Sequence, residues 1–325
     1  MHAAVLTYLD QIDRRGSIRG AAATLAIASS AVNRRLLRLE RELGTPLFQR
    51  RRDGVTLTPA GQAVLAHARG TLDGFARLGA ELDALRGVTA GVVKIVAIDS
   101  LMVNFLPSLV ADLARAHPRI VFQVLAEGPV GATEALRAGL ADIALAFVDE
   151  RNRDLAVVAR CEVSLGVIMA PGHPLARLRQ VRLAECASYP MVLSHDSMPL
   201  NPLLASELAE HGTRLGPRVV SNGIDFMRRM ILAGLGVGLF TPLGFAKEIA
   251  RGQLVHRPLA EPRLARLAIG AMTLRRRPLA PAAALALEAI RARLGDLAKT
   301  GATMLRGRGI GRRGARQRGR SKGNL

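Results

Sequence analysis

The sequence predicts an α/β protein with a small helical unit at its N-terminus. Apolar residues follow a helical period up to about residue 86. From residue 91 onward, uninterrupted apolar runs alternate with helical patterns, which is typical of strands buried on both faces of a parallel sheet. The length of 325 residues exceeds what one ordinary core requires. We therefore expect a helical unit, a long helix and a larger α/β region.

Two short helices open the chain, followed by a third that carries arginines. Ser17 is a predicted N-cap of the second helix, and Gly44 is a predicted C-cap of the third. A three-residue turn between the second and third helices is typical of a helix-turn-helix unit. The residues expected to face inward are Val5, Tyr8, Leu9 and Ile12 in the first helix, Ile18, Ala21, Ala22 and Leu25 in the second, and Val32, Leu36, Leu39 and Leu43 in the third.

A hairpin and a long helix follow. The stretch 45–59 predicts two short strands with Asp53 and Gly54 at the turn. Thr58 is expected to cap the next helix, with Pro59 at its first position. This helix should run to about residue 86 and carries one stripe of small and apolar residues: Gly61, Leu65, Ala68, Leu72, Phe75, Gly79 and Leu82. The stripe fits a dimerisation helix, which we favour, or a helix packed on its own chain.

The outward face of the third helix suits DNA. With the apolar residues inward, that face carries Ser30, Arg34, Leu37, Arg38 and Arg41. Arginine pairs well with guanine in the major groove, and the first residues of such a helix reach base edges. Arg50, Arg51 and Arg52 in the hairpin are expected to meet phosphates. The competing interpretation is an ordinary charged surface helix.

Charge and composition narrow the classes of function. The formal net charge of +20 favours a polyanionic partner. Residues 301–325 contain eight Lys or Arg, no Asp or Glu and few apolar residues, which predicts a disordered basic tail. Cys161 and Cys186 are too few for a disulfide framework or a metal cluster. No secretory signal and no membrane-length apolar run is recognisable, so we expect a cytoplasmic protein without a membrane partner.

Several stretches in order resemble the LysR-type transcriptional regulators. They include "GSIRGAAATLAIASSAVNRRLLRLERELGTPLFQRRRDGVTLTPAGQAVLAHA", "ALRAGLADIALAF", "MAPGHPLA" and "AGLGVGLFTPLGFAKEIARGQLVHRPL", and the resemblance covers residues 3–298. It implies a winged helix-turn-helix domain, a linker helix that pairs subunits, and a periplasmic-binding-protein-like sensor of two α/β subdomains. It also implies double-stranded DNA, a small effector and RNA polymerase as partners, with a homodimer or homotetramer as the assembly.

The resemblance gives an expected division of the chain. The DNA-binding domain is expected over residues 1–58 and the linker helix over 59–90. The effector-binding domain should span 91–300, with subdomain I at 91–160 and 267–300 and subdomain II at 161–266. The basic tail takes 301–325. Neither a cofactor, a metal nor a catalytic residue is expected.

The recognition helix departs from the family pattern. Ala28 stands where the family has a capping serine, although Ser29 could cap one residue later. Ser29 and Ser30 replace a common glutamine and proline, Arg34 is kept, and Leu37 replaces a polar or basic residue. The operator sequence therefore cannot be copied from relatives. The expected DNA-binding residues are Ser29, Ser30, Asn33, Arg34, Arg38, Arg50, Arg51 and Arg52.

An effector is expected between the subdomains, bound by hydroxyls and by free backbone N–H groups at helix N-termini, which favour anions. The family match and the predicted strand ends select Ser100, Leu101, Ser194, Ser197, Asn222 and Thr241. Ser100 is the strongest candidate. Asp99 beside it is unusual, because a carboxylate at the mouth would repel an acidic effector.

Other classes of function stay open at this point. A nucleic-acid binder driven by the basic tail, with a degenerate cleft, is one alternative, and an enzyme or transport receptor of the same fold is another. His195 and Asp196 suggest a catalytic dyad, but no nucleophile motif accompanies them. Cys161 and Cys186 form either a redox switch or, as we favour, a pair of inert buried thiols.

Overall fold

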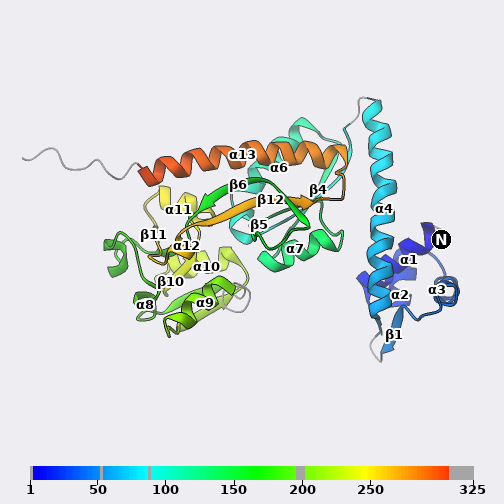
Figure 1. The fold of residues 1–325 in the computed structure, drawn as a ribbon, viewed down its shortest axis with the longest axis horizontal. Helices are drawn as coiled ribbons and strands as arrows, with labels where there is room; N and C mark the ends of the chain where they lie inside the picture. Colours follow the sequence, from blue (N-terminus) through cyan, green and yellow to red (C-terminus); the bar gives the residue numbers. More distant parts are fainter. Residues whose placement is uncertain (1–2, 52–53, 87–88, 195–201, 307–325) are drawn as a thin grey trace, which may run out of the picture.

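The computed structural model describes residues 3–51, 54–86, 89–194 and 202–306. The N-terminal unit contains three helices and a hairpin, and one long helix links it to two α/β subdomains (Figure 1). The N-terminal elements are α1 (Ala3–Arg15), α2 (Ile18–Thr24), α3 (Ser29–Leu43), β1 (Phe48–Arg51), β2 (Gly54–Leu57) and α4 (Pro59–Leu85). No described helix combines the length and the apolar character needed to cross a bilayer.

Local sequence signals set the ends of these elements. Ser17 caps α2 by accepting a hydrogen bond from the Gly20 N–H, and Gly44 ends α3 with a left-handed φ of 67°. The Thr58 hydroxyl accepts from the Gly61 N–H, as expected of the cap of α4. β1 and β2 pair antiparallel, which confirms the predicted hairpin, although Asp53 at its turn lies outside the described residues.

The core of the N-terminal unit differs from the prediction at Leu43. Val32, Leu36 and Leu39 are buried as expected, but Leu43 is 41% exposed. The chain reverses at Gly44, so Leu47 and Phe48 enter the core in its place. The turn between α2 and α3 spans residues 25–28, one residue more than expected.

The first α/β subdomain contains one five-stranded sheet in the order β4-β3-β5-β12-β6. β3 is parallel to β4 and β5, as the apolar runs predict, whereas β12 is antiparallel to β5 and β6, so the sheet is mixed. α6 and α13 cover one face and α7 the other (Figure 1). The elements are β3 (Gly91–Ala97), α5 (Asp99–Met102), α6 (Phe105–Ala116), β4 (Ile120–Ala126), α7 (Pro129–Arg137), β5 (Ile143–Phe147), β6 (Leu155–Val163), β12 (Leu267–Leu274) and α13 (Pro281–Arg306).

The second subdomain contains another mixed sheet, in the order β11-β7-β10-β8-β9. The chain enters it after β6 and returns through β12, so two adjacent strands connect the subdomains. Its elements are β7 (Gly166–Met169), η1 (Pro174–Arg177), α8 (Leu183–Cys186), β8 (Met191–Ser194), α9 (Pro202–Glu210), β9 (Pro217–Ser221), α10 (Ile224–Leu232), β10 (Val237–Phe240), η2 (Pro242–Phe245), α11 (Ala246–Ala250), β11 (Val255–Pro258) and α12 (Pro262–Ala265).

Charged side chains fix α4 to the first subdomain. The Asp73 carboxylate of α4 pairs with the Lys94 ammonium at 3.2 Å and with the Arg277 guanidinium. Arg77 donates to the Pro278 carbonyl at 3.2 Å. Lys94 lies in β3, and Arg277 and Pro278 lie in the loop before α13. The helix α4 is therefore attached to the first subdomain.

Candidate functional site

The outward face of α3 is exposed as the sequence predicts. Ser30, Arg34, Leu37, Arg38 and Arg41 all lie on the surface. The N-cap is Ala28, which makes no side-chain capping bond, so Ser29 is the first helical residue and not the cap. The first backbone N–H groups of α3 therefore lack a side-chain cap at the end of the helix that would enter a groove.

The arginines of α3 differ in how firmly they are held. The Arg35 guanidinium lies over the Tyr8 ring at 5.8 Å, which directs it toward α1. The Arg38 Nε donates to Glu42 at 3.0 Å, but both side chains are more than half exposed, so the pair is weak and can open to a phosphate. Asn33 is half-buried and has contacts of its own. The exposed Arg34 is the strongest candidate for base contact.

Two of the three hairpin arginines lie within β1. Arg50 and Arg51 lie in β1, two and three residues after Phe48, which is buried in the N-terminal core. Arg52 lies outside the described residues.

The stripe on α4 is divided into two parts. Leu65 and Ala68 are buried against the N-terminal core, so this half packs on its own chain. The second half carries exposed apolar side chains at a 3-4-3 spacing, which places them on one helix face: Phe75 (62% exposed), Leu78 (51%), Leu82 (49%) and Leu85 (85%). We call these four residues the α4 apolar face.

A cleft of about 100 Å³ lies between the two subdomains. One wall comes from the ends of β3 and β5 and the start of α7, and the other from β10, α9 and α10. Its lining residues are Ile98, Asp99, Ser100, Glu127, Gly128, Pro129, Phe147, Leu165, Leu204, Ile224, Met227, Leu239, Phe240 and Thr241. The subdomains meet at one end of this cleft, where the Asn104 amide donates to the Leu243 carbonyl at 3.3 Å.

Thr241 is the polar group in this cleft that most clearly lacks a partner. Its side chain is 3% exposed, and its hydroxyl makes no hydrogen bond to any described residue. Thr241 precedes η2 but does not cap it. A buried hydroxyl without a partner costs about 1–3 kcal/mol of folding free energy. A ligand that forms a hydrogen bond with this hydroxyl would replace the bond to water that is lost when the protein folds.

The charges of the cleft are acidic. Asp99 and Glu127 line it, and none of its described lining residues is Lys, Arg or His. The remaining wall is largely apolar, with Phe147, Met227 and Leu239 among its members. An organic anion would meet two carboxylates here without an opposing cation from these residues.

The structure brings together only part of the effector-binding set predicted from the sequence. Ser100 and Thr241 line the cleft, whereas Leu101 is fully buried in the core of the first subdomain. Asn222 is exposed one residue before Gly223, which is the N-cap of α10. Ser194 ends β8 without lining the cleft. Ser197 lies outside the described residues, as do His195 and Asp196.

The apolar lining was not predicted. Phe147, Leu239 and Phe240 lie at the ends of apolar runs that the sequence marks as strands, and a residue at a strand end beside a cleft cannot be told from a core residue by pattern alone.

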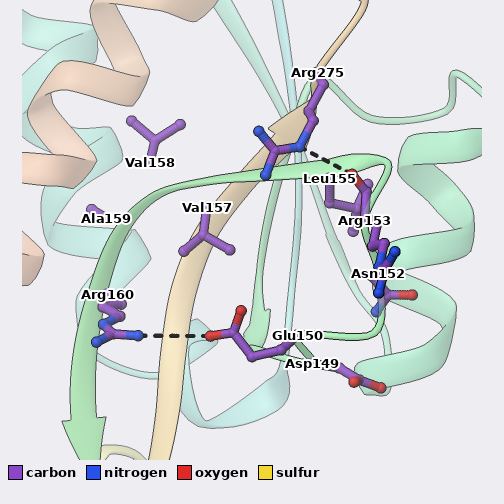
Figure 2. Close-up of a pocket in the computed structure, with 10 residues that line it drawn as sticks. All are labelled: Asp149, Glu150, Asn152, Arg153, Leu155, Val157, Val158, Ala159, Arg160 and Arg275. Atoms are coloured by element: carbon purple, nitrogen blue, oxygen red, sulfur yellow. Dashed lines mark hydrogen bonds and ion pairs between the residues drawn. The ribbon is translucent and has the colours of Figure 1, made fainter.

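A second hollow of about 700 Å³ lies along β6, away from the cleft (Figure 2). The loop from Asp149 to Arg153 faces the strand, and the Glu150–Arg160 ion pair spans the gap at 3.7 Å. The Arg275 Nε donates to the Arg153 carbonyl at 3.0 Å. Hydrogen bonds from Arg151 hold the pKa of Asp149 below its ordinary value. The charges around this hollow are therefore partly neutralised by one another.

Both cysteines are free and buried. Cys161 is 5% exposed and lies in β6, and burial raises the pKa of its thiol. Burial raises the pKa of Cys186 to about 12, with the nearby carboxylates of Glu261 and Glu185 adding to the rise. Thiols kept protonated in this way react slowly with oxidants, which favours the interpretation of inert buried cysteines. Among the described residues, no group of three or more His, Cys, Asp or Glu side chains is arranged to hold a metal ion.

Comparisons with known proteins cover nearly the whole of this architecture. Residues 4–62 match the family model of the bacterial regulatory helix-turn-helix protein, lysR family, and residues 86–295 match the LysR substrate binding domain. An uncharacterized HTH-type transcriptional regulator of Mycobacterium tuberculosis is 31% identical over 258 residues, covering 75% of this chain and 81% of that protein.

Two solved structures share the fold. A single-substitution variant of full-length OxyR from Pseudomonas aeruginosa superposes with a TM-score of 0.68 at 19% identity, covering 90% of this chain and 94% of its own. Full-length CbnR in complex with its target DNA gives a TM-score of 0.58 at 18% identity, covering 90% of this chain and 100% of its own.

Proposed function

Because the chain belongs to the LysR family, and is thus a transcriptional regulator with a helix-turn-helix and an effector-binding domain, we propose that it binds operator DNA as a homodimer or homotetramer and responds to a small effector in the cleft. The exposed arginine face of α3 supports DNA contact through Ser29, Ser30, Asn33, Arg34 and Arg38, with Arg50, Arg51 and Arg52 at the phosphates. Since its DNA partner is in the bacterial cytoplasm, we propose that location, and RNA polymerase as a further partner.

Each segment of the chain has its own proposed function. Residues 1–58 bind DNA, 59–90 pair two subunits, and 91–300 bind the effector, with 161–266 as the second subdomain. The basic stretch 301–325, most of it outside the described residues, adds affinity that does not depend on sequence.

Exposed apolar surface supports self-association. The α4 apolar face is one such surface. On the sensor, the outer strand β4 exposes Val121 and Leu125, and β9 with α10 exposes Val220, Phe226 and Leu232. Exposed apolar groups gathered at sheet edges are typical of interfaces, and two separate surfaces of this kind suit an assembly larger than a dimer.

We propose that the effector is small, mostly apolar, and neutral or cationic. The single observation that carries the effector site is the buried Thr241 hydroxyl, which makes no hydrogen bond to any described residue and lies in a largely apolar cleft. The carboxylates of Asp99 and Glu127 would repel an anionic effector. A volume of about 100 Å³ leaves room for only a few heavy atoms unless the subdomains open.

Thr241→Val is expected to stabilise the effector-free protein while removing its response to effector. Valine has nearly the shape of threonine but leaves no buried hydroxyl without a partner, so the free energy of unfolding should rise by about 1 kcal/mol. Thermal unfolding measures this rise, and a reporter gene under the selected operator measures the response. Thr241→Ser keeps the hydroxyl and should keep the response. A valine variant that is less stable and still responds would contradict the assignment of Thr241 to the effector.

A further inference from the structure

Leu37 is out of place among the residues on the outward face of α3. Its side chain is 42% exposed, while Arg34, Arg38 and Arg41 around it are all exposed and cationic. The core beneath the helix is already filled by Val32, Leu36 and Leu39. The Leu37 side chain therefore contributes little to packing within the described chain.

The position of Leu37 on the helix is that of a base-reading residue. Counting from Ser30, the positions Ser30, Asn33, Arg34 and Leu37 follow the spacing i, i+3, i+4, i+7, which places them on one stripe. Recognition helices of the homeodomain class read bases with side chains at this same spacing. Arg38 pairs with Glu42 on the neighbouring stripe, and the Arg41 Nε bonds to the Leu37 carbonyl at 3.3 Å, one turn further along.

Only one kind of group in the major groove suits an apolar side chain. The base edges there present hydrogen-bond donors and acceptors, except for the 5-methyl group of thymine. We propose that Leu37 contacts a thymine methyl group in each half-site and is a specificity-determining residue of this regulator. This inference rests on the proposed function, namely that α3 enters the major groove.

The test replaces thymine by uracil, which removes the methyl group and changes no hydrogen bond. Sites are first selected from random duplex DNA with the full-length protein, and each thymine of the selected half-site is then replaced singly by deoxyuridine. The wild-type protein should lose about three- to tenfold in affinity at one thymine position, as expected for one buried methyl group. Leu37→Ala should bind the thymine site more weakly by a similar factor and should not distinguish thymine from uracil.

Leu43→Ala is the matched control. Leu43 is a leucine of the same helix with 41% exposure, but it lies off this stripe, six residues further on. This variant should keep the full thymine preference. Because both leucines are exposed, both variants should fold, and thermal unfolding checks this.

Different results would overturn the role of Leu37 and the proposed DNA recognition by α3. Selection of a defined site without any loss on uracil substitution, or the same loss in Leu37→Ala as in wild type, would overturn the role of Leu37 and leave the regulator assignment standing. Failure to select any sequence would instead overturn DNA recognition by α3, and the inference with it.

Discussion

Gly61→Ala is expected to destabilise the N-terminal unit by about 3 kcal/mol and to abolish DNA binding with it. A Cβ at this position would lie about 2.0 Å from the Leu47 carbonyl oxygen and 2.9 Å from a Leu57 methyl carbon. The Leu47 carbonyl is backbone held from both sides: it accepts from the Thr58 N–H, and the Leu47 N–H donates to Glu40 at 2.7 Å. The Leu57 methyl can shift by a change of rotamer, but the Leu47 carbonyl cannot move away without displacing the backbone of the hairpin from α4.

Helix propensity alone predicts the opposite sign, since alanine is favoured over glycine inside a helix by about 0.5–1 kcal/mol. Gly70→Ala, in the same helix, is the control, because no atom lies within 4 Å of its added Cβ. That variant should be slightly stabilised. Chemical denaturation of the two variants measures the contrast, and equal stabilities would show that α4 does not pack on the Leu47 carbonyl as described.

Leu78→Asp combined with Leu82→Asp should halve the mass of the assembly and weaken binding to a two-half-site operator by about 10²- to 10⁴-fold. Both side chains are about half exposed in the single chain, so charging them costs little folding energy. In a paired α4 apolar face the same carboxylates would be buried against leucines, which is strongly unfavourable. Separate subunits would then bind the two half-sites independently, without the higher affinity that linking two DNA-binding domains provides.

Light scattering and titration of operator DNA measure the two effects. Leu178→Asp, at a leucine 36% exposed on the sensor, is the control and should change neither quantity. A double variant with unchanged mass and unchanged operator affinity would refute α4 as the pairing helix and favour the alternative in which the whole stripe serves its own chain.

The N-terminal fold could be predicted closely because its signals are local. Ser17, Gly44, Thr58 and Pro59 act within one turn of the residues they terminate, and each works as its type predicts. Leu43 could not be placed in the same way. Its position depends on how Leu47 returns to the core after the Gly44 turn, which is a tertiary choice.

The α/β part was predictable in class but not in detail. Continuous apolar runs marked β3, β4, β5, β7 and β10 as buried strands, but an apolar run carries no sign of direction. The antiparallel direction of β12 therefore went unrecognised, although the family resemblance placed the return of the chain to the first subdomain near residue 265.

The residues that line the cleft could also be predicted only in part. Thr241 could be selected because it is a hydroxyl directly after an apolar strand. Ser100 could be selected because it lies at the start of the helix after the first strand and matches the family's Ser or Thr there. Leu101 follows Ser100 in sequence but is buried in the core, and Asn222 lies exposed one residue before Gly223, the N-cap of α10. Which of several strand-end residues face a cleft depends on how two subdomains are set against each other, and no local pattern encodes that.

The central claim is that this chain selects operator sequences through α3. The most direct test is the selection of genomic fragments by the purified full-length protein, with a variant ending at residue 300 in parallel. We expect discrete fragments that share a two-fold-related motif, retained by the shortened variant with reduced overall affinity. Even recovery of the genome that collapses when residues 301–325 are removed would contradict the claim and would assign DNA binding to the basic tail.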